Sequence, residues 1–237
     1  MMIDISDVVA RLEEFVRLKR AFDGIPGLGI AITDRTRTVH SGEYGVSDVA
    51  SGAPVRKETL FQIGSIGKSF TDIALLQLQE QRRVDLQESV TEYLPWFDVR
   101  SRHAPITLHH LMTHTAGIPI GSEATMAPES EVWELRRIET SAPAGEFFHY
   151  SNTGYKVLGL ILETVTGMPY AEVVSSSILE PLGMTQTAPA ITNDVWQRSA
   201  VGYTWLEDDR PPARNGPMSP ATWFESSSGD GSISSTA

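Results

Sequence analysis

Residues 59–71 read TLFQIGSIGKSFT, and this stretch decides how the rest of the chain is interpreted. A short apolar run ends at Gly64, and a helix is expected from Ser65 to about Gln81. Apolar residues cover most of the circumference of that helix, which predicts a central and largely buried helix. These residues are Ile66, Phe70, Ile73, Ala74, Leu75, Leu76 and Leu78.

Ser65 and Lys68 are three residues apart at the expected helix start, so their side chains share one helical face. The lysine amine can then reach the serine hydroxyl and take its proton, while the helix N-terminus favours the developing alkoxide. The alternative is that Ser65 only caps the helix. The spacing by itself leaves both interpretations open.

Tyr150, Ser151 and Asn152 form a second candidate group, placed after a Pro/Gly turn and just before an expected helix. A lysine ammonium close to the Tyr150 hydroxyl would lower the phenol pKa from about 10 and let it move protons. The amide of Asn152 can hold a substrate amide. The alternative is a half-buried tyrosine beside an asparagine turn or cap.

The composition fits a globular protein with one large domain or two smaller ones: 237 residues, 41% of them hydrophobic and 21% charged. The absence of cysteine excludes disulfides, thiolate nucleophiles and cysteine-bound zinc. A formal net charge of −11 disfavours nucleic acid as a partner. The sequence shows neither a secretory signal nor the roughly 18 apolar residues of a membrane span, so we expect no membrane partner and a cytoplasmic location.

Strands are expected at the front of the chain and helices in the middle. Residues 28–33 read as a strand buried on both faces, with residues 38–46 as its hairpin partner. Two strands cannot form a stable sheet alone, so further strands must complete the sheet, and we do not find them in this sequence. Helices are expected over residues 5–18, 107–113 with Thr107 as N-cap, 153–166, and from 169 to about 182.

Two weaker patterns suggest a nucleotide or a metal, and both are set aside. Gly67-Lys68-Ser69 resembles the end of a phosphate-binding loop, but Gln62 stands where that motif needs glycine. His110 and His114 are four residues apart, as zinc ligands on a helix can be, yet no glutamate follows His110 as a metalloprotease requires. The sequence therefore predicts no metal and no cofactor.

Seven segments in order resemble the penicillin-recognising serine hydrolases from about residue 8 to residue 237. Within them, the chain looks like the class C β-lactamase branch, which also holds D-Ala-D-Ala carboxypeptidases, D-aminopeptidases and esterases of the β-lactamase fold. The segments are residues 25–31, 59–71, 90–93, 94–97, 106–119, 143–155 and 179–184.

The resemblance implies an α/β (α+β) fold of the β-lactamase/transpeptidase type, in which helices flank an antiparallel sheet and a mostly helical subdomain is added. One domain then spans residues 1–237. Residues 1–64 would start the sheet region, residues 65–225 would form the helical region with the motifs, and residues 226–237 would return to the sheet.

The resemblance also implies acyl transfer. Ser65 is similar to the acylated nucleophile of the family and Lys68 to its base in the Ser-x-x-Lys motif. Tyr150 and Asn152 match the Tyr-x-Asn motif, with Tyr150 catalytic and Asn152 binding substrate. The substrate would be an ester, a β-lactam or a small D-amino-acid peptide, and an esterase or peptidase is favoured. The alternative is a non-catalytic binding or scaffold protein that keeps the fold.

One family feature is missing from the sequence. A Lys-Thr-Gly-like motif should follow the segment matched by residues 231–237, where the chain stops. The resemblance implies that the missing part would supply three sheet strands and a C-terminal helix. It would also supply the second N–H of the oxyanion hole, whose first N–H comes from the backbone of Ser65. We therefore expect residues 1–237 alone to be weakly active or inactive and poorly stable, unless the missing segment pairs with them as a separate chain.

Overall fold

The computed structural model describes residues 5–103, 105–118, 127–205 and 218–237. The chain forms two compact units. Unit 1 comprises residues 1–61, 194–223 and 235–237, and unit 2 comprises residues 62–193 and 224–234. Each unit is described by itself below.

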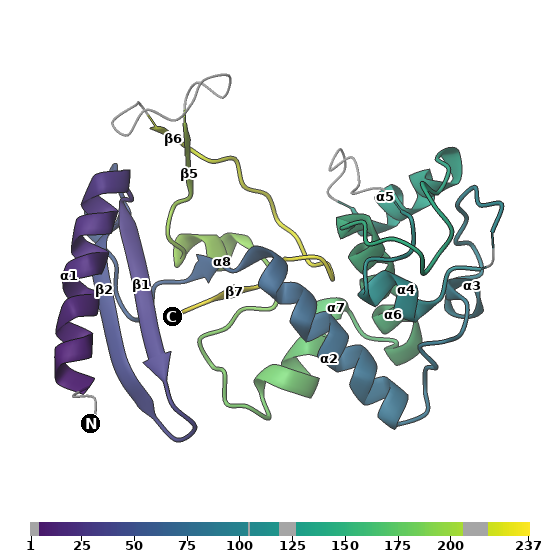
Figure 1. Ribbon diagram of the computed structural model, residues 1–237, viewed down its shortest axis with the longest axis horizontal. Coiled ribbons are helices and arrows are strands. Elements are labelled where there is room, and N and C mark those ends of the chain that lie inside the picture. Colours follow the sequence, from purple (N-terminus) through teal and green to yellow (C-terminus); the bar gives the residue numbers. More distant parts are fainter. Residues whose placement is uncertain (1–4, 104, 119–126, 206–217) are drawn as a thin grey trace. The chain divides into compact units, whose positions relative to one another are not determined.

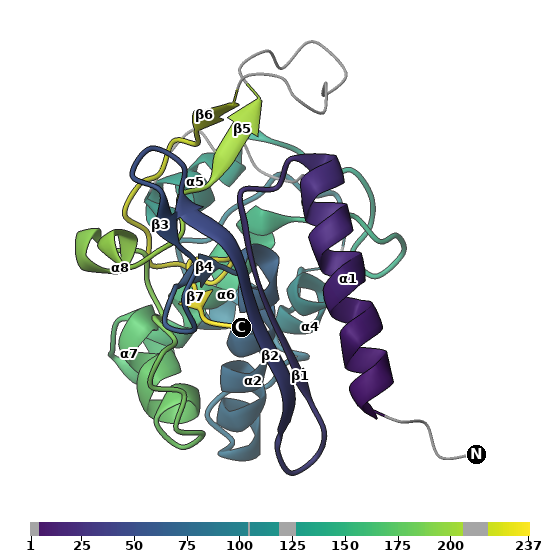
Figure 2. The ribbon, with the colours of Figure 1, turned by 90° about the vertical axis from the view of Figure 1, so that its left-hand side faces the viewer.

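Unit 1 is built on an antiparallel hairpin with one long helix alongside it (Figure 2). β1 (Gly27–Thr33) pairs with β2 (Thr38–Asp48), which pairs in turn with the short β3 (Ala53–Pro54). The hairpin predicted at residues 28–46 is thereby confirmed. α1 (Ile5–Asp23) ends at Gly24, whose φ of 67° is a conformation that glycine adopts without strain.

The prediction that the first strand is buried on both faces is wrong for the described chain. Every residue of β1 is half-buried or exposed. The physical reason is that the described sheet has three strands and one flanking helix, so little of unit 1 is available to cover β1. The unit also contains α8 (Asn193–Gln197), which begins one residue before the unit boundary, and the pair β5 (Tyr203–Trp205) and β6 (Met218–Pro220).

Unit 2 is mainly helical, and α6 (Asn152–Thr166) is its most deeply buried helix. Ten consecutive residues of α6, 153–162, are buried, as expected for a helix with apolar residues on all sides. The Ser151 side chain caps its start by accepting the Gly154 N–H, and Gly167 ends it at a φ of 72°. These limits confirm the predicted helix 153–166 to within one residue.

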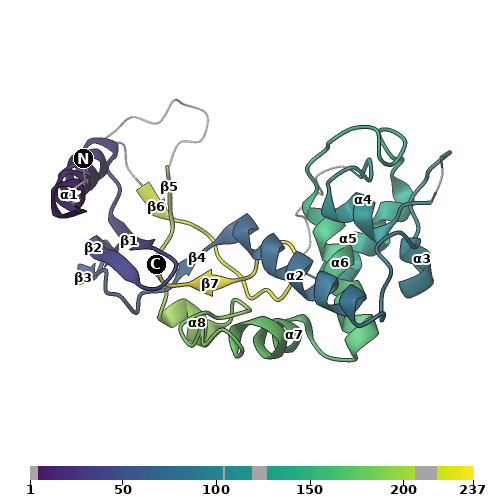
Figure 3. The same cartoon turned by 60° about the horizontal axis from the view of Figure 1, so that its bottom comes forward.

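The other helices of unit 2 are short except for α2 (Figure 3). α4 (Leu108–Met112) begins at Thr107, which caps it as predicted. Pro119, which the sequence places after this helix, lies outside the described residues. The other helical segments among the described residues of unit 2 are η1 (Gly64–Ile66), α2 (Gly67–Glu80), α3 (Val90–Tyr93), α5 (Pro128–Glu134), η2 (Leu135–Arg137), α7 (Tyr170–Val174) and the π-helical η3 (Ser175–Leu179). β4 (Phe61–Gln62) and β7 (Ser234–Ser235) form a short two-stranded sheet.

The prediction that the helix after Ser65 is largely buried holds for one side only. The buried residues of α2 recur every three or four positions, which makes one stripe: Gly67, Lys68, Thr71, Ala74, Leu75 and Leu78. Ile66, Ile73 and Leu76 are 63%, 43% and 46% exposed. A count of apolar residues around a helix does not show which side has a neighbour, and this is why the prediction overstated the burial.

Sequence reasoning missed α5 and η2, because it expected no helix between residues 113 and 153. The signals of a helix start were present. Pro128 is at the first helical position, and Glu129 and Glu131 lie in the first turn, where carboxylates interact favourably with the helix dipole. Val132 and Leu135 then supply the buried face.

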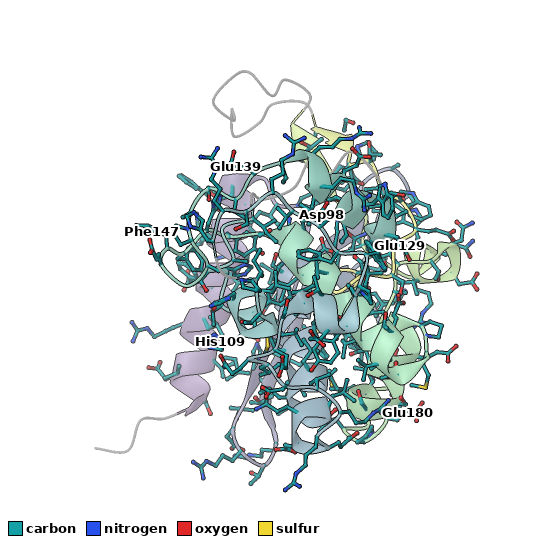
Figure 4. All side chains as sticks on the ribbon, turned by 90° about the vertical axis from the view of Figure 1, so that its right-hand side faces the viewer. Asp98, His109, Glu129, Glu139, Phe147 and Glu180 are labelled. Atoms are coloured by element: carbon teal, nitrogen blue, oxygen red, sulfur yellow. The ribbon has the colours of Figure 1, made fainter. Side chains whose placement is uncertain are left out.

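Four acidic side chains can be located individually on the surface of unit 2. In Figure 4, the labelled carboxylates Asp98, Glu129, Glu139 and Glu180 lie apart from one another on one face of unit 2. Among the described residues, no single helix has the length and apolar composition to cross a membrane. One pair bent by 78°, residues 152–166 with residues 170–179, passes the same criterion.

Candidate active site

Ser65 lies in η1 (Gly64–Ile66), a single 3₁₀ turn that leads directly into α2. Gly64 has a φ of 52°, which turns the chain from β4 into the helix. The Ser65 side chain is exposed. Its Oγ accepts hydrogen bonds from Lys68 Nζ at 3.1 Å and from the Tyr150 hydroxyl at 2.5 Å. Ser65 is not the cap of this turn, since Ile63 occupies that position.

Lys68 stands at the centre of the group and is only 6% exposed. Its Nζ donates to Ser65 Oγ at 3.1 Å, to Asn152 Oδ1 at 2.9 Å and to the backbone carbonyl of Asp230 at 2.5 Å. Three acceptors match the three N–H bonds of an ammonium group. The amine is therefore held in one position within reach of the serine.

Tyr150 and Asn152 flank the cap of α6, so the start of this helix aims both side chains at Lys68. The Lys68 ammonium lies 5.0 Å from the centre of the Tyr150 ring. Burial by itself would raise the pKa of Tyr150, but polar contacts with Lys68 and Ser65 and the charge of Lys68 outweigh it and lower the pKa. The phenol thus gives up its proton more readily than a free tyrosine.

The carbonyl of Asp230 is a part of the site that sequence reasoning missed. It belongs to a loop of unit 2 that packs closely on α2, where the carbonyl of Gly229 accepts from Thr71 Oγ1 at 2.7 Å. Within the loop, Ser232 Oγ accepts from the Ser228 N–H at 2.9 Å. A Cβ on Gly229 would lie 2.4 Å from the carbonyl of Tyr155. The Gly-Asp-Gly sequence at 229–231 signals this close backbone approach.

A cavity of about 300 Å³ opens beside Ser65. Its walls combine hydroxyl and amide groups, such as Asn152 and Ser228, with the apolar side chains of Ile191 and Phe224. Such a mixture suits a small substrate that carries a polar carbonyl and an apolar part. The exposed Ser65 hydroxyl is one of the groups on its wall.

The two histidines considered as a zinc pair have other contacts. Nδ1 of His110 accepts the Thr107 N–H at 3.1 Å and completes the cap of α4. Nδ1 of His114 accepts the Ser151 N–H at 3.0 Å. Within the described residues, no three His, Asp or Glu side chains are grouped to hold a metal. Lys68, considered as part of a phosphate loop, is instead committed to Ser65, Asn152 and Asp230.

A comparison with protein families agrees with this geometry. The β-lactamase family model matches residues 12–237. The chain belongs to the β-lactamase family. "Protein flp" of Staphylococcus aureus (strain N315) is 31% identical over 188 residues, which are 76% of this chain and 38% of that protein. "Penicillin-binding protein 4*" of Bacillus subtilis (strain 168) is 28% identical over 155 residues, 61% of this chain and 34% of that protein.

Several solved structures share the fold of this chain. An octameric penicillin-binding protein homologue from Pyrococcus abyssi has a TM-score of 0.85 at 32% identity, over 96% of this chain and 53% of that one. A class C β-lactamase has a TM-score of 0.82 at 23% identity, over 99% and 63%. EstCE1, a hydrolase with promiscuous acyltransferase activity, has a TM-score of 0.82 at 22% identity, over 98% and 70%. The expected β-lactamase/transpeptidase-like fold is confirmed, and membership supports a function of the serine hydrolase type in general.

Proposed function

We propose that this chain carries the reacting groups of a serine hydrolase that forms an acyl-enzyme at Ser65. The observation that carries the proposal is the exposed Ser65 Oγ, held between Lys68 Nζ at 3.1 Å and the Tyr150 hydroxyl at 2.5 Å. A serine becomes nucleophilic when a neighbouring base takes its proton. Both neighbours lie within the distance that proton transfer requires.

In the proposed reaction, the Ser65 proton passes to the Lys68–Tyr150 pair as Oγ attacks the substrate carbonyl. The lysine charge favours the phenolate form of Tyr150, which can accept that proton. The pair then protonates the leaving group as the tetrahedral intermediate collapses to an ester on Ser65. Water, deprotonated by the same pair, releases the acyl group and restores the serine.

The substrate class we propose is an ester, a β-lactam or a small D-amino-acid peptide, with an esterase or peptidase favoured. The cavity beside Ser65 supports a small substrate, because its volume is about 300 Å³ and its walls are partly polar. Asn152 is the proposed contact for a substrate amide, for which Lys68 would have to release its Oδ1. No cofactor takes part in the proposed reaction.

The test is an activity panel of p-nitrophenyl esters, nitrocefin and D-amino-acid amides on the purified protein. We expect Lys68→Ala to lower kcat/KM by about 10²–10⁴-fold and Tyr150→Phe by about 10²-fold. Lys57→Ala is the matched control, since this lysine side chain is 79% exposed in unit 1.

Near-normal rates in either active-site variant would contradict the proton transfer assigned to the pair. A folded protein that turns over none of these substrates and forms no adduct at Ser65 would contradict the hydrolase and favour a binding or scaffold protein.

A further inference from the structure

His114 has a backbone conformation that is uncommon for residues other than glycine. Its φ is 56°, and among the described non-glycine residues only Arg82 shares a positive φ. Such a conformation costs energy and persists only where contacts hold it. Here the His114 N–H donates to the carbonyl of Leu111 at 3.1 Å, and its carbonyl accepts the His149 N–H at 2.7 Å.

The His114 side chain contacts the backbone of the Tyr-x-Asn segment. Its Nδ1 accepts the N–H of Ser151, the residue between Tyr150 and Asn152, at 3.0 Å. An imidazole nitrogen accepts a hydrogen bond only when it carries no proton, so the proton of the neutral ring is on Nε2. This contact fixes the backbone from which both site residues extend.

The His114 ring also packs against three aromatic rings. Its centre lies 4.4 Å from the Tyr150 ring at an angle of 31°, and 5.0 Å from the Tyr155 ring. Phe148 packs edge-on at 5.6 Å. Tyr150 is half-buried, so this ring contact limits how the phenol can turn away from Ser65.

We propose that neutral His114 is a positioning residue that holds the Tyr150 hydroxyl against Ser65, and that protonation of His114 releases it. An imidazolium carries N–H on both nitrogens, so Nδ1 would face the Ser151 N–H as a second donor. The bond to Ser151 would be lost and the Tyr-x-Asn segment would loosen. The effect on catalysis rests on the proposed function, whereas the contact itself does not.

The surroundings of His114 favour the neutral ring. Burial, and then the charge of Lys68 on α2, lower the pKa of His114 below its usual value. Among the described residues, the phenols of Tyr150 and Tyr155 also contact the ring, and Tyr155 donates in turn to the carboxyl of Asp72 on α2. The backbone N–H of His149, a further titratable residue, donates to the carbonyl of His114. At neutral pH the ring is therefore uncharged and able to accept.

The contact can be tested without any activity. Long-range ¹H–¹⁵N correlation spectra of the histidine rings at pH 7 should show His114 as the Nε2–H tautomer, titrating below the value of an ordinary histidine. An Nδ1–H tautomer, or a doubly protonated ring at pH 7, would overturn the proposal even if the hydrolase is correct.

The positioning role is tested by the rate at which a fluorophosphonate labels Ser65. His114→Phe keeps a ring but loses the acceptor, and His114→Asn keeps an acceptor at the δ position, tolerates positive φ and loses the ring. We expect each to label about 10- to 10²-fold more slowly, because small displacements of a reacting group have effects of that size. His110→Asn, which alters the cap of α4, should label within about twofold of wild type.

The pH profile separates positioning from general loosening. In wild type, labelling should fall on the acid side as His114 is protonated, and His114→Asn should lack that part of the fall. Equal acid limbs in the two proteins, or normal labelling by His114→Phe and His114→Asn, would overturn the proposal. Failure of wild type to label at all would count against the proposed function, while the tautomer would still decide the contact.

Discussion

Unit 1 and unit 2 bury very different amounts of apolar side chain. Among the described residues, unit 1 buries the hydrophobic side chains of Val16, Val55 and Leu60. In unit 2 the single helix α6 buries more than that, including Leu158 and Ile161 at 0% exposure. A large shared core is what holds side chains in fixed positions.

The difference indicates which unit can hold side chains in fixed positions. All four predicted site residues and the Asp230 carbonyl belong to unit 2. Unit 1 instead leaves apolar side chains on α1 in contact with solvent. Val8, Phe15, Leu18 and Phe22 are 46%, 61%, 53% and 51% exposed. We therefore expect substitutions in unit 2 to cost far more stability than matched substitutions in unit 1.

The largest effect is expected at a buried ion pair of unit 2. Glu131 is 4% exposed and accepts from Lys156 Nζ at 2.5 Å and from Thr153 Oγ1 at 2.5 Å. Glu131→Ala leaves the Lys156 charge buried without this partner and should lower the free energy of unfolding by about 3–5 kcal/mol. Urea denaturation measures the change. A loss below 1 kcal/mol, on the scale of a surface pair, would contradict the contrast between the units.

A core substitution compares the two units directly. Leu158→Ala in α6 should lower the free energy of unfolding by about 2–5 kcal/mol, because the side chain is fully buried and its removal leaves a cavity. The matched change is Phe15→Ala in α1, where the ring is 61% exposed, and it should cost less than about 1 kcal/mol. Similar losses in thermal or urea denaturation would show that α1 is covered in solution.

Carboxyl groups in the two units should respond to pH in opposite directions. In unit 2, burial raises the pKa of Asp72 to about 6, against the hydrogen bond from Tyr155 and the charge of Lys68. The folded protein then binds this proton more tightly than the unfolded chain, so stability falls as pH rises from about 4 to 6. Asp72→Asn should stabilise the protein by about 1 kcal/mol at pH 7.5, with the gain vanishing near pH 4.

Asp48 in unit 1 is the matched carboxyl. Hydrogen bonds from the Ser51 side chain and the Ala50 N–H lower its pKa. A carboxyl whose pKa is lower in the folded protein than in the unfolded chain contributes stability above its unfolded pKa, and this contribution is lost as the pH falls. Asp48→Asn should therefore destabilise the protein at pH 7.5 and not at low pH. Thermal unfolding from pH 4 to 8 compares the variants, and equal signs at pH 7.5 would contradict the account.

Local signals explain which parts of the fold the sequence predicts well. Ser151 and Gly167 limit α6, and Thr107 starts α4, because caps act on their own helix ends. The exposed side of α2 was not predictable, since it depends on which neighbours pack on that helix. The exposure of β1 was missed for the same reason.

In the candidate active site, too, local features were predictable and contacts between distant residues were not. The closeness of Ser65 and Lys68 follows from helical spacing, whereas Asn152 lies 84 residues from Lys68 and was joined to it only by resemblance to a family. The Asp230 contact uses a backbone carbonyl, which every residue type has, so only the flanking glycines, which allow a close backbone approach, pointed to this loop. The role of His114 was hidden because its pattern with His110 suggested a metal.

The smallest effect is expected at a surface ion pair of unit 1. On α1, Glu14 Oε1 lies 3.8 Å from a guanidinium nitrogen of Arg17, and both side chains are 67% exposed. Glu14→Ala should change the free energy of unfolding by less than about 0.5 kcal/mol, since water and salt screen such pairs. A loss as large as that of Glu131→Ala would remove the distinction between the two units.

The most direct test of the central claim is covalent labelling at Ser65. The protein is treated with a fluorophosphonate, and intact-mass analysis with peptide mapping locates the adduct. The account predicts one adduct, on Ser65, that is absent in Ser65→Ala and formed much more slowly in Lys68→Ala, because the amine 3.1 Å from Oγ activates the serine. No adduct on the folded protein, or an adduct that persists in Ser65→Ala, would contradict it.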